Sequence, residues 1–140
     1  MSLKQIKNTL EAYLIANVTT TAIKMPNTTF YTLNNVALTQ SQIDALKLYI
    51  EPKMIPIMQD RELMSSATPI NYESFLQIDI CTDAGEGMGT TFTLIAALDA
   101  LFREKTISGV VCLRTQTLNS FEVGGIVVTP YRILASLRAG

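Results

Sequence analysis

Residues 75–102 carry the clearest pattern of apolar and polar positions in the chain. Between residues 75 and 80 the two kinds of side chain alternate, and this period of two predicts a strand with one buried face. Three glycines at alternate positions follow at 85–89, where they allow the backbone conformations of a sharp reversal. From residue 90 apolar positions recur every three or four residues, which predicts a core helix. The residues on its apolar face are Phe92, Ile95, Leu98 and Phe102.

The same periodicities predict a helix and a short strand before this unit. Apolar positions on one face predict a helix over residues 2–18, and the threonines at 19–21 oppose its continuation because β-branched side chains lose rotamer freedom there. A strand-like piece at 28–33 ends at a turn signal, Asn34-Asn35. Residues 38–46 fit either a short helix or a loop.

The next part of the chain predicts a short strand, two prolines that interrupt it, and a long polar loop. Alternation at residues 45–50 predicts a half-buried strand, and Pro52 and Pro56 are expected to break any regular ladder beyond it. Residues 60–72 predict a loop of about a dozen residues, a length that is uncommon in compact domains and often functional or mobile. We expect this loop to become ordered only in an assembly.

The C-terminal third of the chain predicts a hairpin. Residues 110–118 predict one strand, 121–125 a hairpin connection and 126–134 the partner strand. Pro130 lies inside the second strand, so we expect that strand to be an edge strand or to carry a bulge. Residues 135–140 are expected to be frayed.

The order of these elements predicts one α+β domain over residues 1–140. We expect a mainly antiparallel sheet of about four to five strands packed with two main helices. A chain of 140 residues has the commonest size of a single domain.

Four large apolar residues lie around the prolines, and they are the candidate subunit interface. Two interpretations are open for this stretch. It is either a strand edge or loop packed onto the core, or a contact surface for a neighbouring subunit, where the flexibility of methionine suits adaptable packing. The residues are Met54, Ile55, Ile57 and Met58.

The composition narrows the classes of function. The chain is 48% hydrophobic and 16% charged, below the roughly 25% charge of typical proteins, so it either buries much of its surface or presents some to a partner. The net charge is −1 with scattered basic residues, which argues against general nucleic-acid binding. Cys81 and Cys112 are expected to be buried free thiols. We expect no secretory signal and no membrane span.

The residues offer little catalytic chemistry. The chain has no histidine and no tryptophan, which excludes Ser-His and Cys-His arrangements and the usual zinc sites. Asp79, Asp83 and Glu86 could either hold a divalent ion or cap the turn and the helix start. The glycines at 85–89 lack the spacing of a dinucleotide loop, and no Walker lysine is near; a tight reversal and a nucleotide site remain the alternatives. We predict no catalytic residue and no cofactor.

Several short motifs follow one another along the chain, at residues 10–14, 26–30, 48–52, 75–80, 85–89, Leu101-Phe102 and 128–132. In this order they resemble the phage tail terminator (tail completion) proteins of long-tailed phages, the group that includes the lambda minor tail protein U. The resemblance spans nearly the whole chain, and the strand, glycine turn and helix over residues 75–102 are its most telling part.

This resemblance implies a structural virion protein without enzymatic activity. Such proteins form a homo-hexameric ring on the finished tail tube, stop its growth and offer a surface to the head–tail connector. The implied partners are other copies of the chain, the tail tube protein and the connector protein, with DNA only passing through the channel and no membrane contact. The implied location is the tail or neck of the virion, after assembly in the host cytoplasm.

Three other interpretations stay open at this point. One is a different neck or tail component, such as a head-completion or tube protein. Another is a small ligand-binding domain or enzyme that uses the region from Asp79 to Glu86. The third is a monomeric regulatory domain that binds a host protein through residues 54–58.

Overall fold

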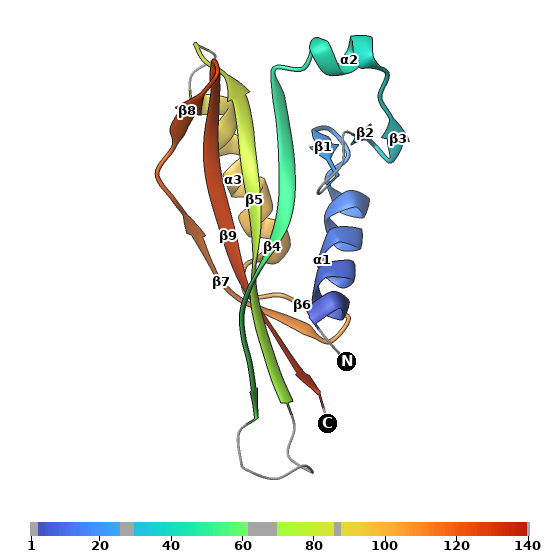
Figure 1. Cartoon of the computed structure of the whole chain (residues 1–140), viewed down its shortest axis with the longest axis vertical. Coiled ribbons are helices and arrows are strands. Elements are labelled where there is room, and N and C mark those ends of the chain that lie inside the picture. Colours follow the sequence, from blue (N-terminus) through green and yellow to red (C-terminus); the bar gives the residue numbers. More distant parts are fainter. Residues whose placement is uncertain (1–2, 26–29, 62–69, 86–87, 140) are drawn as a thin grey trace.

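Three long adjacent strands form the spine of the molecule. The structure is a computed structural model and describes residues 3–25, 30–61, 70–85 and 88–139. The strands are β4 (Leu48–Arg61), β5 (Ile70–Asp83) and β9 (Ile126–Ala139), each of 14 residues. β5 lies between the other two and pairs antiparallel with both along its whole length (Figure 1).

Shorter strands extend the sheet on both sides of this spine. Next to β4 lie β1 (Ala22–Lys24), β2 (Tyr31–Leu33) and β3 (Val36–Ala37), and β1 runs parallel to β4. Next to β9 lies β7 (Val110–Thr117) with β6 (Thr106–Ile107) at its side, while β8 (Phe121–Val123) pairs with the start of β9. The strand order is β3-β2-β1-β4-β5-β9-β7-β6.

The predicted fold of four to five strands and two main helices is wrong. The described residues form a mixed sheet of nine strands with three helices. Five of these strands, β1, β2, β3, β6 and β8, have only two or three residues. Such pieces are too short to show a period of two, so the alternation of apolar residues cannot reveal them.

The helices are α1 (Leu3–Asn17), α2 (Gln40–Asp44) and α3 (Gly89–Phe102). α1 confirms the helix that was predicted over residues 2–18. Of the two alternatives for residues 38–46, α2 shows that the short helix is correct. It begins with a capping box, in which the Thr39 hydroxyl accepts from the backbone N–H of Gln42 and the Gln42 side-chain oxygen accepts from the backbone N–H of Thr39.

The predicted apolar face of α3 is correct only in part. The structure buries Leu98 and Phe102 as expected, but it also buries Thr91 and Leu94, and it leaves the Phe92 ring 60% exposed. Apolar residues occur on nearly every side of this helix, so their spacing defines its buried face poorly.

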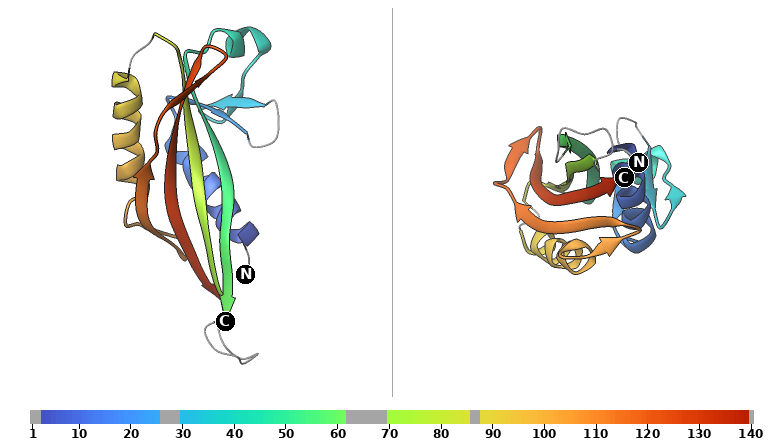
Figure 2. Two further views of the ribbon diagram at one scale, coloured as in Figure 1. Left: turned by 60° about the vertical axis from the view of Figure 1, so that its left-hand side comes forward. Right: turned by 90° about the horizontal axis from the view of Figure 1, so that it is seen from below.

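Helices α1 and α3 pack on the same face of the sheet and share one core with it (Figure 2). The Tyr13 ring of α1 meets the Phe102 ring of α3 edge-on with centroids 5.3 Å apart, and the Tyr13 hydroxyl donates to the Leu101 carbonyl at 3.1 Å. The sheet contributes alternate residues of its central strands, as a strand with one buried face requires. They include Leu76, Ile78, Ile80, Tyr131, Ile133, Ala135 and Leu137.

The prolines do not break the strands as predicted. β4 runs through Pro52 and Pro56, which pair with β5 residues, and a bulge follows Pro56. A proline nitrogen fits this ladder only when it faces away from β5, toward the free edge of β4. Pro130 lies in an interior strand, not at an edge. Its carbonyl accepts from the Leu118 amide, so its nitrogen faces the place where β9 changes partner from β8 to β7.

The ends of the predicted loop and tail also differ from expectation. The loop predicted at 60–72 is shorter, because β4 continues to Arg61 and β5 begins at Ile70; its remainder, residues 62–69, lies outside the described residues. The expected fraying at 135–140 is wrong as far as Ala139, which still pairs with β5. The prediction of buried free thiols is confirmed for Cys81 and Cys112. None of the described helices has the length and apolar character to cross a membrane.

Candidate subunit-interaction surfaces

The four predicted interface residues do not share one surface. Met54 packs against the core, where the Ser74 hydroxyl donates to its sulfur at 3.7 Å. Ile55 follows it in the strand and is half-buried on the opposite face. Ile57 and Met58 belong to the backbone of β4, but their side chains lie outside the described part of the molecule. Of the four, Ile55 is therefore the residue that the structure places away from the helices.

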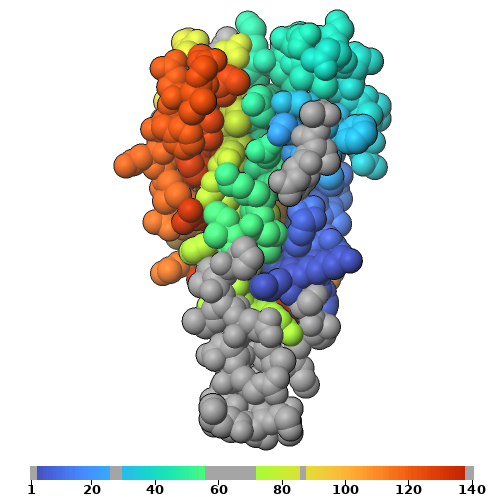
Figure 3. All heavy atoms as spheres, viewed as in Figure 1, coloured from blue at the N-terminus to red at the C-terminus, as the bar shows by residue number. Residues whose placement is uncertain are grey.

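We call the sheet surface opposite α1 and α3 the open face. Figure 3 shows β4 and β5 at the molecular surface on this side. Its side chains come from the positions that alternate with the core positions of β4, β5 and β9. The open face consists of Tyr49, Glu51, Lys53, Ile55, Phe75, Gln77, Asp79, Cys81, Arg132 and Leu134.

A chain of polar contacts crosses the open face over three strands. Lys53 forms an ion pair with Asp79 at 3.0 Å, and the Gln77 amide donates to the other Asp79 oxygen at 2.8 Å. Arg132 Nε donates to the Gln77 carbonyl oxygen at 2.8 Å, and its guanidinium lies 5.2 Å from the centroid of the Phe75 ring. Gln77 and Asp79 are only 6% and 8% exposed, so these contacts satisfy polar groups that burial would otherwise penalise.

The divalent-ion alternative gains no support from this arrangement. Both Asp79 oxygens already have partners, and Asp83 is exposed at the end of β5. Glu86 lies outside the described residues. In the ranges that the structure describes, no three Cys, Asp or Glu side chains come close enough to hold a metal ion.

A second polar cluster joins β1, β2 and β4 on the same side of the sheet. Lys24 forms an ion pair with Glu51, and the Tyr31 and Tyr49 rings meet edge-on with centroids 5.3 Å apart. The hydrogen bond with Glu51 raises the pKa of Lys24, and burial raises the pKa of the Cys81 thiol to about 11. Near neutral pH the amine therefore stays charged and the thiol stays protonated, the forms that are poor nucleophiles.

Asp99 connects α3 to the sheet by hydrogen bonds. Its Oδ1 accepts hydrogen bonds from the Thr115 hydroxyl of β7 at 2.8 Å and from the Tyr131 hydroxyl of β9. Burial raises the pKa of Tyr131 above its ordinary value, with a further rise from the bond to Asp99. The phenol therefore remains a donor to the Asp99 carboxylate over the whole neutral range.

Two hairpins on opposite sides of the three long strands expose apolar side chains (Figure 1). The β8–β9 hairpin exposes Phe121 and Val123, at 51% and 59%. On the other side, Val36 of the β2–β3 hairpin is 64% exposed, and Phe30 just before β2 is 66% exposed. The sequence prediction missed both surfaces. It assigned residues 121–125 to a hairpin connection, although two of them are large apolar residues that a turn does not need, and it assigned residues 28–33 to a strand-like piece without a surface role.

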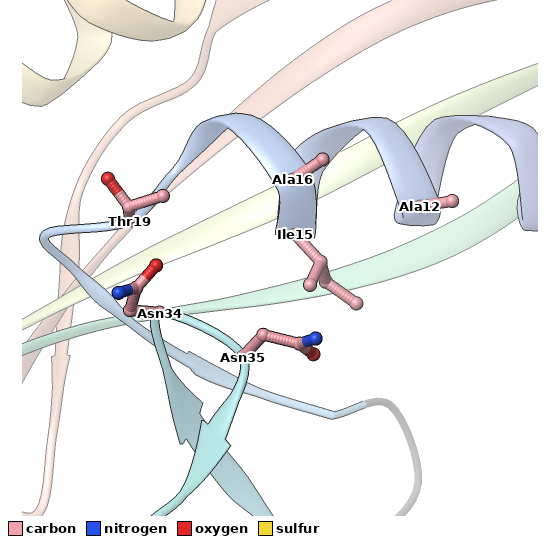
Figure 4. Close-up of a pocket in the computed structure, with 6 residues that line it drawn as sticks. All are labelled: Ala12, Ile15, Ala16, Thr19, Asn34 and Asn35. Atoms are coloured by element: carbon pink, nitrogen blue, oxygen red, sulfur yellow. The ribbon is translucent and has the colours of Figure 1, made fainter.

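A surface pocket of about 400 Å³ lies between the end of α1 and the β2–β3 hairpin (Figure 4). Asn34 and Asn35 form the hairpin turn with left-handed φ values of 51° and 61°, which asparagine tolerates better than most residues. The lining is small, apolar or uncharged. It consists of Ala12, Ile15, Ala16, Thr19, Asn34 and Asn35.

Comparison with known proteins gives a fold but no function. No protein-family model matches the chain, and no curated protein matches it. Among the solved structures two chains match, and one of them has a TM-score of 0.68 and 17% identity, over 97% of this chain and 95% of that chain. That protein carries no functional name, and at this identity the likeness extends to the fold alone.

Proposed function

We propose that this chain is a structural protein whose copies join head to tail into a closed ring. The observation that carries the proposal is the exposure of apolar side chains on two different hairpins, β8–β9 and β2–β3, which lie on opposite sides of the three long strands (Figure 1). A ring of identical chains needs two different surfaces on each copy, one for each neighbour. Contiguous apolar surface on a small protein marks an interaction site.

The setting that we propose for this ring is the end of a tail tube in a long-tailed phage. This part of the proposal comes from the resemblance of the motifs to the tail terminator proteins. There the ring, a hexamer, stops growth of the tube and joins it to the head connector, while DNA passes through the channel. A net charge of −1 suits a channel wall that DNA slides past rather than binds.

The electrostatics of the polar clusters support a structural role over an enzymatic one. Catalytic sites usually lower the pKa of a thiol or amine nucleophile or raise that of a carboxylic acid. Here the pKa of Lys24 and the pKa values of both thiols are raised. Each of these shifts holds the group in its unreactive form.

Electron microscopy of the purified protein, alone and with isolated tail tubes, tests the proposal. We expect rings with a central hole, and rings bound at one end of each tube. Rings that stack into long tubes would favour a tube protein instead. Single small particles, with bare tube ends, would contradict the proposal.

A further inference from the structure

The chain carries an exposed apolar hairpin, β8–β9, and a surface pocket beside α1. We propose that Phe121 and Val123 of one copy insert into the pocket of the next copy. This inference rests on the proposed ring function and specifies the contact that repeats around the ring. It assigns an occupant to the pocket: the tip of a second copy of this chain.

The pocket suits an apolar side chain. Ala12 and Ala16 are one turn apart on α1 and leave space, and Ile15 adds an apolar side chain that reaches toward the hairpin turn. Asn34 and Asn35 stand opposite on the hairpin turn (Figure 4). The volume of about 400 Å³ is many times that of a water and matches small-group pockets, which begin at roughly 300 Å³. None of the described residues that line it is charged, so an apolar group enters without removing water from a charge on these residues.

The hairpin suits the role of the inserted element. Phe121 pairs with Val128 and Val123 pairs with Ile126, so these four side chains share one face of the hairpin. Gly124 and Gly125, with φ values of 56° and 81°, close the turn. Because β9 continues into the centre of the sheet, the hairpin is already ordered, and insertion costs little conformational entropy.

The apolar area of the hairpin is large enough to form the centre of a stable interface. Two half-exposed and two half-buried apolar side chains present on the order of 250 Å². This is about a third of the roughly 800 Å² that each partner buries in a standard interface, and such interfaces place their apolar residues at the centre. The remaining area falls to neighbouring polar surface.

The placement of the two elements favours a second copy over another occupant. Both lie in the upper half of Figure 1, on opposite sides of the long strands. Each chain therefore carries the inserting part on one side and the receiving part on the other. A contact between two such different surfaces repeats from copy to copy and closes into a ring if the rotation permits.

Disulfide cross-linking of the full chain tests the contact. Ala16→Cys protein is mixed with Phe121→Cys protein under mild oxidation, and the double variant Ala16→Cys/Phe121→Cys is oxidised alone. The native thiols do not interfere, because Cys81 and Cys112 are 6% and 1% exposed. We expect covalent dimers in the mixture and a ladder of covalent oligomers in the double variant. The matched control is Phe92→Cys with Ala16→Cys, since Phe92 on α3 is 60% exposed against 51% for Phe121, and it is expected to give neither product.

A charge substitution separates this inference from the ring proposal. Phe121→Asp is expected to raise the concentration for half-assembly at least about tenfold, while Phe92→Asp leaves it unchanged. Circular dichroism checks that both variants fold. Intact rings without cross-links, or rings that survive Phe121→Asp, overturn the inference and leave the ring proposal standing. A monomer at every concentration overturns both.

Discussion

Replacing Asp99 with alanine is expected to loosen helix α3 from the sheet. The change removes the oxygen that accepts from the hydroxyls of Thr115 and Tyr131. Tyr131 is only 1% exposed, so its hydroxyl loses its partner in a place that water reaches poorly. A buried donor left without a partner costs about 1–3 kcal/mol, and the half-buried Thr115 hydroxyl can turn to water, so its lost bond adds only about 1 kcal/mol.

We therefore expect Asp99→Ala to lower the free energy of unfolding by about 2–4 kcal/mol. For a chain of this length, this corresponds to a fall in Tm of roughly 6–15 °C. Urea denaturation at one fixed protein concentration is the assay, since self-association would make the midpoint concentration-dependent. Asp99→Asn keeps an acceptor oxygen and is the matched control, with a smaller loss.

A double-mutant cycle of Asp99→Asn with Tyr131→Phe isolates the bond between the two side chains. We expect the two losses to be less than additive, because either change alone already removes or weakens the same contact. Loss of less than about 0.5 kcal/mol in Asp99→Ala, or strictly additive losses in the cycle, would refute the assigned role of Asp99.

Three further predictions concern the core, the thiols and the edge of β4. Leu98→Ala is expected to cost about 2–5 kcal/mol of stability and Phe92→Ala less than about 0.5 kcal/mol, measured by thermal denaturation; equal losses would contradict the orientation of α3. Burial raises the pKa of Cys81 and Cys112 from 9.0 to about 11, so folding stability attributable to these thiols is complete below pH 9 and is lost as pH rises toward 11. Native protein at pH 8 is accordingly expected to react with a thiol reagent only on unfolding, and rapid labelling of folded protein would count against the buried placement. Pro52→Val is expected to keep the fold but to restore a backbone donor on the free edge of β4, and so to increase aggregation measured by light scattering. No increase in aggregation would contradict the inference that proline protects this edge.

The sequence predicted the periodic elements of the core well. Residues 76, 78 and 80 alternate with polar ones, and this single feature located β5 and the buried face that receives α1 and α3. The same reasoning failed where the pattern was weak or short. α3 is apolar on most sides, so Phe92 was assigned to the core although it lies in solvent.

The prolines show why the rule that proline interrupts a strand was not sufficient to predict the end of β4. Pro52 and Pro56 lie four residues apart, so both nitrogens point to the same side of β4. Among the described strands, only the short β1 pairs with that side. A strand can contain prolines whose nitrogens all point to its unpaired side without losing a hydrogen bond to the strand on its other side, here β5. Sequence position alone does not tell which side faces a partner.

The candidate interface depended on contacts that only the folded chain brings together. Met54 and Ile55 are adjacent in sequence but belong to opposite faces of the sheet. The pocket joins residues of α1 to Asn34 and Asn35. Of the two apolar hairpins, β2–β3 lies at one end of the strand order and β8 pairs with the interior strand β9. No periodicity within one element reports such a juxtaposition.

The mass of the wild-type protein in solution tests the central claim most directly. Light scattering coupled to size exclusion measures it over a range of concentrations. The account predicts one closed species with a mass of six times 15.4 kDa at high concentration. A mass of 15.4 kDa at every concentration would contradict it.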